Sequence, residues 1–204
     1  MQSENPSALY SKEALSNALI ELIKEKPYNQ ITIMELTKRA DLGRRTFYRH
    51  FNSKDEILAH IIKKMGGEFN DALLKAKGSG IYELQVRDAA LIKTQGLGAY
   101  EIAEIFFTVC YANISFLLDL HKQRLMTFLF YEINRLLPLI RGSVVTDESE
   151  AKQFEEEHRE KISYILYFQA GGFWSVLYKW LEDGAKKSPQ EMARMVSSII
   201  SNFI

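Results

Sequence analysis

Polar side chains that can bond to nucleic acid stand almost consecutively between residues 44 and 50. They are Arg44, Arg45, Thr46, Tyr48, Arg49 and His50. An arginine can bond O6 and N7 of one guanine together, and threonine and tyrosine hydroxyls suit phosphate oxygens. A solvated basic face on an ordinary helix is the alternative, and it would be the better interpretation of two arginines alone. The whole set favours a short helix whose exposed face binds DNA.

Helix-start signals flank this segment. Thr32 to Glu35 reads T-I-M-E, a capping box in which a hydroxyl and a carboxylate satisfy free amides at a helix start. In the following Asp41-Leu42-Gly43, the aspartate tolerates the left-handed conformation of a tight turn and the glycine can serve as an N-cap. Ser53 to Glu56 is a further capping box, which opens a longer helix. The sequence therefore predicts two short helices around a tight turn, held against a first helix that ends before Pro27.

The stretch from Ile31 to Leu58 resembles the helix-turn-helix signature of the TetR family of transcriptional regulators. The resemblance is carried mainly by Thr46-Phe47-Tyr48-Arg49-His50-Phe51, followed by Ser53-Lys54. It implies that the second short helix enters the major groove and that Lys54 holds a phosphate. Whether Arg45 reads a guanine or clamps a phosphate stays open. The DNA-binding set that we expect is Thr32, Arg44, Arg45, Thr46, Tyr48, Arg49, His50 and Lys54.

Two residues of the turn depart from the family pattern. Members usually carry glycine where this chain has Asp41, and serine or threonine where it has Gly43. Both substitutes are conformationally permitted, so we expect the helix-turn-helix to form.

The rest of the chain predicts an all-α fold. Prolines at 6, 27, 138 and 189 bracket long stretches whose apolar residues recur at helical spacing. These stretches are an apolar run over 99–120, a helix over about 125–137, a long segment over about 150–183 that Gly184 caps, and a last helix whose start is marked by Ser188, Pro189 and Glu191.

A run of Gly-Ser-Gly after Lys77 marks a break in the helical pattern. We expect three parts: a TetR-type helix-turn-helix domain of three helices at 1–53, with the motif itself at about 32–51, a connecting helix at 54–77, and a C-terminal helical bundle for regulation and dimerisation at 78–204.

The C-terminal end carries a second resemblance, to a domain type found in many Gram-positive TetR-family regulators. It rests on Phe168, Gly171-Gly172, Trp180-Leu181, Gly184 and Ser188-Pro189-Gln190-Glu191. The resemblance implies an isologous homodimer in which the last two helices pair across a two-fold axis. Its two recognition helices would lie about 35 Å apart on a near-palindromic operator. The interface residues that we expect are Gly172, Phe173, Val176, Trp180, Met192, Met195, Val196, Ile199, Ile200 and Phe203.

Glycines at 171 and 172 lie in the middle of a predicted helix, where each costs about 1 kcal/mol relative to alanine. Close approach of a neighbouring helix would explain them, and a kink or bulge is the alternative.

Aromatic residues crowd the middle of the chain and could line a pocket for a small apolar or aromatic effector. The candidates are Phe106, Phe107, Tyr111, Phe128, Tyr131 and Phe168. Aromatic residues at helical spacing are more often core than pocket, so both interpretations stay open for each of them.

The overall composition excludes several classes of function. Basic and acidic residues both number 26, so net charge does not indicate a partner. Lone Cys110 lies in an apolar run, and His121 and His158 have no partner at ligand spacing, so we expect neither metal nor cofactor. No glycine-rich phosphate loop or nucleophile–base arrangement points to an enzyme. The polar start and the lack of a long apolar run favour a cytoplasmic protein away from membranes. A co-regulator switched by a protein partner is the competing function.

Overall fold

The computed structural model describes residues 5–77, 84–85, 93–94, 99–142 and 149–202. Within these ranges the chain is almost entirely helical, as predicted. The exception is a two-stranded antiparallel ladder of β1 (Leu84–Gln85) and β2 (Lys93–Thr94), in which Leu84 pairs with Thr94.

Helix α1 (Pro6–Glu25) begins with Asn5 as N-cap, whose side-chain oxygen accepts the N–H of Ser7 at 3.0 Å. Proline at the first helical position leaves no donor unsatisfied there. An apolar stripe on α1 is buried, and Pro27 follows the end of the helix. The stripe consists of Leu15, Ala18, Leu19, Leu22 and Ile23.

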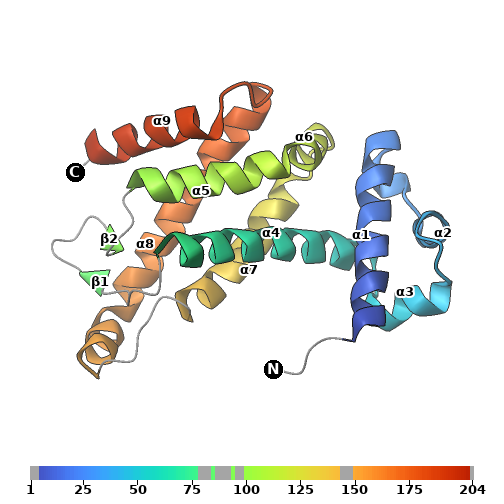
Figure 1. Ribbon diagram of the computed structural model, residues 1–204, viewed down its shortest axis with the longest axis horizontal. Helices are drawn as coiled ribbons and strands as arrows, with labels where there is room; N and C mark the ends of the chain where they lie inside the picture. The colour runs from blue at the N-terminus through green and yellow to red at the C-terminus, as the bar shows by residue number, and fades with distance from the viewer. Residues whose placement is uncertain (1–4, 78–83, 86–92, 95–98, 143–148, 203–204) are drawn as a thin grey trace.

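A 3₁₀ turn, η1 (Tyr28–Gln30), leads into α2 (Ile33–Arg39) and α3 (Arg44–His50). Leu36 of α2 and Phe47 of α3 are fully buried in the core cluster that also includes the α1 stripe. Both short helices contact α1 and each other, so packing against α1 holds the pair in place. Figure 1 shows these three helices gathered at one end of the molecule.

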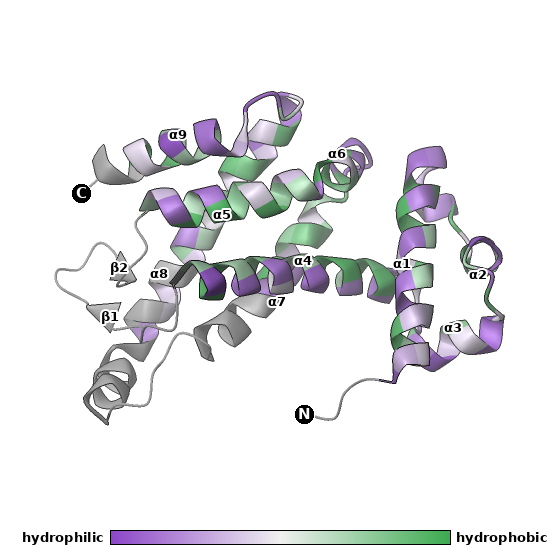
Figure 2. Ribbon diagram, in the orientation of Figure 1, coloured by the Kyte–Doolittle hydropathy of each residue, from purple (hydrophilic) through white to green (hydrophobic). Residues whose placement is uncertain are grey.

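Helix α4 (Lys54–Lys77) runs from this group into the C-terminal body (Figure 1). It contacts α1 at its start and α5 and α7 farther along. Figure 2 shows hydrophobic residues along the edge of α4 that faces α5 and hydrophilic residues along the opposite edge. One helix thus belongs to both halves of the molecule.

The C-terminal body contains α5 (Ala99–Ala112), α6 (Ile114–Lys122), α7 (Met126–Gly142), α8 (Ser149–Glu182) and α9 (Pro189–Asn202). The apolar run over 99–120 is not one straight element, because α5 and α6 meet at Asn113 with a bend of 76°. In the described part of the chain no single helix is long and apolar enough to cross a membrane, and only this bent pair meets the criterion when taken together.

Helix ends in the body follow the predicted caps. Gly184 adopts a φ of 77° after α8, as expected of a C-terminal glycine. The N–H of Ser188 donates to Glu191 Oε2 at 2.7 Å and the N–H of Glu191 to Ser188 Oγ at 3.2 Å, which confirms the capping box of α9. Helix α9 then lies along α5 (Figure 1).

Candidate nucleic-acid interface

The start of α2 is fixed by the predicted capping box. The N–H of Glu35 donates to Thr32 Oγ1 at 3.2 Å, and Glu35 Oε2 accepts the N–H of Thr32 at 2.9 Å. Glu35 Oε1 also lies 2.6 Å from Lys26 Nζ, which ties α2 to the residue after α1. These bonds hold the first helix of the pair in a fixed register against α1.

The turn between α2 and α3 is built as the sequence predicts. Asp41 has a φ of 51°, in the left-handed region. Its N–H donates to Lys38 O at 3.3 Å and the N–H of Leu42 donates to Thr37 O at 2.9 Å, a Schellman motif without the usual glycine. Gly43 is the N-cap of α3 with extended backbone angles and no side-chain bond.

Helix α3 has one buried side chain and a polar outer face. The Phe47 ring is fully buried and meets the rings of Tyr48 and Phe51 at centroid distances of 5.1 and 6.4 Å. Burial of a phenylalanine side chain contributes about 1.5–3 kcal/mol, enough to hold a two-turn helix in place. Figure 1 shows α3 at the edge of the molecule, beyond α1.

The outer face of α3 carries the predicted contact residues. Arg44, Arg45, Tyr48 and Arg49 are exposed, with 57% of Tyr48 accessible, whereas Thr46 and His50 are half-buried. Within the residues that the structure describes, neither Arg44 nor Arg45 has a carboxylate within salt-bridge distance. Guanidinium groups that no carboxylate neutralises are free to meet phosphates or base edges.

Arginine at position 39, one helix earlier, is in the opposite situation. Arg39 makes a bidentate pair with Glu25 at 2.7 and 2.8 Å and reaches Glu21 at 3.1 Å. Its guanidinium lowers the pKa of the Glu25 carboxyl, mainly through the side-chain hydrogen bond. Arg39 therefore fastens α2 to α1, and the unneutralised arginines of the motif are those on α3.

Two further candidates, Thr32 and Lys54, already make bonds inside the protein. The Thr32 hydroxyl belongs to the capping box. Lys54 Nζ donates to Tyr28 O at 2.6 Å and Ile31 O at 3.0 Å, and it lies 4.7 Å from the centre of the Tyr28 ring. An ammonium has three donors, and within the described residues two carbonyl oxygens accept from Lys54.

The cap of α4 differs from the expected box in one respect. Ser53 Oγ accepts the N–H of Glu56 at 3.2 Å, as predicted. The Glu56 carboxylate, however, returns to the N–H of Asn52 at 2.8 Å rather than to that of Ser53. Asn52 also donates its side-chain amide to Glu56, so this residue takes the bond that the sequence assigns to its neighbour.

The predicted pocket residues separate into two groups. Phe106 and Phe107 lie inside the body with Phe173, and Phe107 also meets Trp180 at 5.4 Å. Phe128 is half-buried against the same core. Tyr111 stacks on Trp180 from an exposed position, whereas Tyr131 is 62% and Phe168 84% accessible. The structure therefore packs Phe106, Phe107 and Phe128 into or against the core and leaves Tyr131 and Phe168 exposed.

The predicted interface residues also separate. Trp180, Met192 and Val196 are buried inside the protomer, and Phe173 and Val176 are half-buried against its core. These five side chains serve the fold of one chain, because α9 turns them toward α5 or α8 turns them toward the aromatic core. Gly172, Met195 and Ile199 are exposed. The side chain of Ile200 and the whole of Phe203 lie outside the described residues.

Glycines 171 and 172 do not mark a close approach within the described residues of the chain. A Cβ built at either position meets no atom within 4 Å. Helix α8 also runs through both positions without interruption. These glycines leave a shallow, open stretch on the surface of α8.

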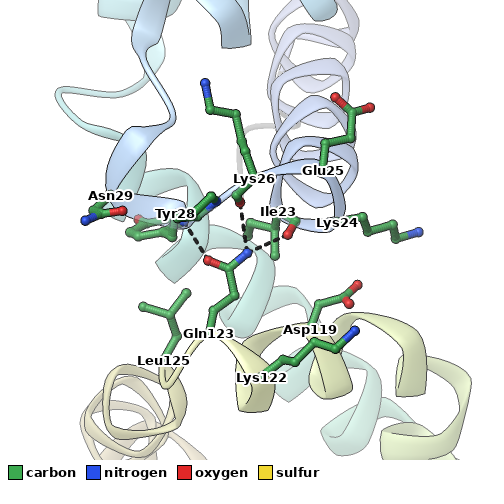
Figure 3. A pocket seen from close by; sticks show the side chains of 11 residues that line it. Ile23, Lys24, Glu25, Lys26, Tyr28, Asn29, Asp119, Lys122, Gln123 and Leu125 are labelled. Carbon is green, nitrogen blue, oxygen red and sulfur yellow. Dashed lines mark hydrogen bonds between the residues drawn. The ribbon is translucent and has the colours of Figure 1, made fainter.

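A groove of about 610 Å³ lies between the end of α1 and the turn from α6 to α7 (Figure 3). Gln123 extends from that turn into the groove and bonds to the main chain around Tyr28. Burial and the nearby Asp55 carboxylate raise the pKa of the Tyr28 hydroxyl, which donates to Asp55. Sequence reasoning missed both residues, since Gln123 lies 95 residues from Tyr28 and neither belongs to a motif.

Metal ligands do not gather in the described residues: no group of three or more histidine, cysteine, aspartate or glutamate side chains could hold an ion there. Cys110 is buried, and burial raises the pKa of its thiol to about 12.

Comparison with known proteins adds independent findings. Residues 11–61 match the family model described as bacterial regulatory proteins, tetR family, and residues 99–202 match one described as a transcriptional regulator C-terminal region. The Bacillus subtilis protein YxbF, described as an uncharacterized HTH-type transcriptional regulator, is 33% identical over 82 residues. That match covers 40% of this chain and 22% of the length of YxbF.

Two solved structures share the fold. The fatty acid degradation regulator FadR from Bacillus halodurans superimposes with a TM-score of 0.59 at 17% identity, over 98% of this chain and 96% of the other. The dihydroxyacetone kinase operon activator DhaS gives a TM-score of 0.53 at 15% identity, over 95% and 96% of the two chains.

Proposed function

Because the chain belongs to the TetR family of bacterial regulatory proteins, we propose that it is a ligand-responsive repressor that binds a near-palindromic operator as a homodimer. The observation that supports operator binding best is the outer face of α3. Arg44, Arg45 and Tyr48 are exposed on this face, and the helix is anchored by buried Phe47. In the described residues no carboxylate pairs with either arginine. Thr46, Arg49, His50, Thr32 and Lys54 complete the proposed contact set. Residues 1–53, 54–77 and 78–204 act as DNA-binding, connecting and regulatory parts.

Exposed apolar side chains on α8 and α9 support a homodimer. Met195 and Ile199 are 41% and 44% accessible on α9, and Phe168 and Tyr164 are exposed on α8 beside the open stretch at Gly172. Isolated exposed apolar residues are ordinary, but these occupy the two helices at one end of the chain. An isologous interface would bury these side chains in both copies of the chain.

The effector that we propose is a small apolar or aromatic molecule bound in the body. Phe107 belongs to the core, and Phe106 and Phe128 pack against it, so an effector bound there would have to separate packed side chains. Such a ligand lowers operator affinity only as far as it prefers the conformer that does not bind DNA. No catalytic role is proposed.

A co-regulator switched by a protein partner is the second candidate. The exposed aromatic side chains of α8, Tyr164 and Phe168, would also suit a protein surface. One fold neighbour, DhaS, is described as an operon activator, so the shared fold does not fix the sign of regulation. Crosslinking in the native cell discriminates between the candidates, because a regulator that responds only to a small molecule should yield no stoichiometric protein partner.

Fluorescence anisotropy with the DNA upstream of the protein's own gene tests operator binding. Replacing both Arg44→Ala and Tyr48→Ala should weaken specific binding about 30-fold or more, since each good base contact contributes about 1–3 kcal/mol and two therefore contribute at least about 2 kcal/mol. Arg194→Ala, which removes an exposed arginine from α9, is the matched control and should leave the affinity unchanged. Unchanged affinity in the double variant, or binding that does not weaken with salt, would exclude this function.

A further inference from the structure

The side-chain amide of Gln123 joins the C-terminal body to the main chain between α1 and α2. Its Oε1 accepts the N–H of Tyr28 at 2.6 Å. Its Nε2 donates to the carbonyl oxygens of Ile23 at 2.5 Å and Lys26 at 2.9 Å. Figure 3 shows the amide pointing from the α6–α7 turn into the space between these three main-chain groups.

These main-chain groups are ones that the end of α1 leaves open. The last carbonyls of a helix have no partner within it, and Pro27, which has no N–H, follows α1 immediately after Lys26. The site requires one acceptor for the Tyr28 N–H and two donors for the carbonyls. Only a carboxamide supplies both, because a carboxylate would set oxygen against oxygen and an ammonium has no acceptor.

The backbone that carries Gln123 is itself fixed. Gln123 is the C-cap of α6, and the next residue, Arg124, adopts a φ of 59°. The N–H of Arg124 donates to His121 O at 3.0 Å and that of Leu125 to Leu120 O at 2.9 Å. The amide is therefore presented from a closed helix end and does not hang on a loose loop.

From Tyr28 the connection continues to the start of α4. The Tyr28 carbonyl accepts from Lys54 Nζ, the ring lies under the same ammonium, and the hydroxyl donates to Asp55. Tyr28 thus contacts Gln123 on one side and two residues in the first turn of α4 on the other. Lys54 belongs to the proposed DNA-binding set.

We propose that Gln123 is a positioning residue, whose carboxamide sets the orientation of the DNA-binding unit, α1 to α3, on the C-terminal body and through Tyr28 the position of Lys54. The expected effect on DNA binding rests on the proposed function, whereas the effect on the orientation of the DNA-binding unit does not. In the described residues this is the side chain that bonds from the body to the main chain of η1 and the end of α1. Loss of its bonds would let the two recognition helices of a dimer vary in spacing.

The orientation can be measured without DNA. Spin labels introduced through Lys38→Cys on α2 and Lys186→Cys after α8 report one distance between the unit and the body, since both lysines are exposed. Buried Cys110, whose thiol pKa is raised to about 12, should not react with the label. Labelled chains are diluted with unlabelled ones, so that each distance is measured within a chain.

Two variants at position 123 change the amide in different ways. Gln123→Glu keeps the size of the side chain but loses both donors, and Gln123→Leu loses every bond. Both should broaden or shift the distance distribution, whereas Lys122→Ala, at an exposed neighbour in the same turn, should leave it unchanged. Thermal unfolding shows whether each variant is folded. A folded Gln123→Glu protein with the parent's distance distribution would overturn the proposal.

Operator binding provides the functional measurement. Two linked DNA-binding units bind two half-sites about 10²–10⁴ times more tightly than one unit binds one half-site, and this gain in affinity depends on the spacing of the units. Both variants should therefore bind a DNA with two half-sites about tenfold more weakly. Binding to the same DNA with one half-site scrambled should fall less, since each helix still reads its own half-site and only the Lys54 contact is disturbed. Equal losses on both DNAs, or no loss on either, would overturn the positioning role. If the parent protein binds no operator, the proposed function fails, and the distance measurement alone decides the role of Gln123.

Discussion

Glu35 combines two local interactions at the first turn of α2. One carboxylate oxygen accepts from the N–H and the hydroxyl of Thr32, and the other lies 2.6 Å from the Lys26 ammonium. The Lys26 hydrogen bond and then the Thr32 bonds lower the pKa of the Glu35 carboxyl from 4.5 to about 2. The ionised carboxylate is the form that these donors stabilise, so protonation must loosen the start of the helix-turn-helix.

Glu35→Gln should therefore lower the Tm at pH 7 and have little effect near pH 2. The pKa of the carboxyl is lower in the folded chain than in the unfolded chain, so its ionisation stabilises the fold above about pH 4.5. That stabilisation is lost as the pH falls toward 2. Glutamine can still complete a capping box, so the variant removes the charge more than the cap.

Circular dichroism during heating, repeated from pH 7 to pH 2, measures this effect. Glu101→Gln, which removes an exposed carboxylate from α5, controls for the change in net charge. A difference in Tm between the Glu35 variant and the parent that is the same at every pH would contradict the explanation.

Single residues could be predicted from the sequence where their partners are near in the chain. Thr32 with Glu35 and Asp41 in its turn both follow from local patterns. Gln123 could not be predicted, because its partners lie 95 to 100 residues away and main-chain groups leave no mark on the sequence. The bonds of Lys54 to the carbonyls of Tyr28 and Ile31 could not be predicted for the same reason.

The C-terminal ends of three helices share one main-chain pattern. After α2, α6 and α8 the chain makes the two bonds of a Schellman motif, with Asp41, Arg124 and Gly184 in the left-handed position. Glycine adopts this conformation without steric cost, and aspartate tolerates it better than most residues. Arginine at the end of α6 therefore holds the least favourable backbone of the three.

Arg124→Gly should stabilise the chain by about 1 kcal/mol, which corresponds to a rise in Tm of about 2–4 °C for a chain of this size. The side chain of Arg124 is exposed and has no ion-pair partner in the described residues, so little is lost with it. Calorimetry measures the shift. Arg124→Ala, which removes the same side chain but keeps a Cβ, should bring no comparable gain, and an equal gain would refute the backbone explanation.

Elements with strong local signals were predicted well, and those fixed by packing were not. Pro27, the capping boxes and Gly184 placed the ends of α1, α2, α8 and α9. The bend at Asn113 could not be predicted, because the apolar run continues on both sides of it. Asn113 donates to Val109 O and to Glu68 on α4, so the bend is coupled to a tertiary contact.

For the whole molecule, burial decides which apolar residues remain for a partner. Sequence periodicity puts Met192, Met195, Val196 and Ile199 on one apolar face of α9. In the structure this face divides, since α5 covers Met192 and Val196 while Met195 and Ile199 stay exposed. A hydrophobic face wider than its own core needs is what pairing with a second copy would require.

Ile199→Asp, combined with Met195→Asp, should convert a dimer into monomers while the fold is retained, because both side chains are accessible in the single chain. A two-fold interface contains the same residues from both copies, so each substitution places two aspartates in the interface and destabilises the dimer twice. Analytical ultracentrifugation measures the state of association, with Leu74→Asp as the control at an exposed apolar position on α4.

Monomers should also bind a two-half-site operator about 100-fold more weakly, since they lose the affinity gained from two linked sites. They should bind a single half-site about as well as before. A double variant that still sediments as a dimer would move the interface away from α9, and a parent protein that sediments as a monomer would remove the basis for a palindromic operator.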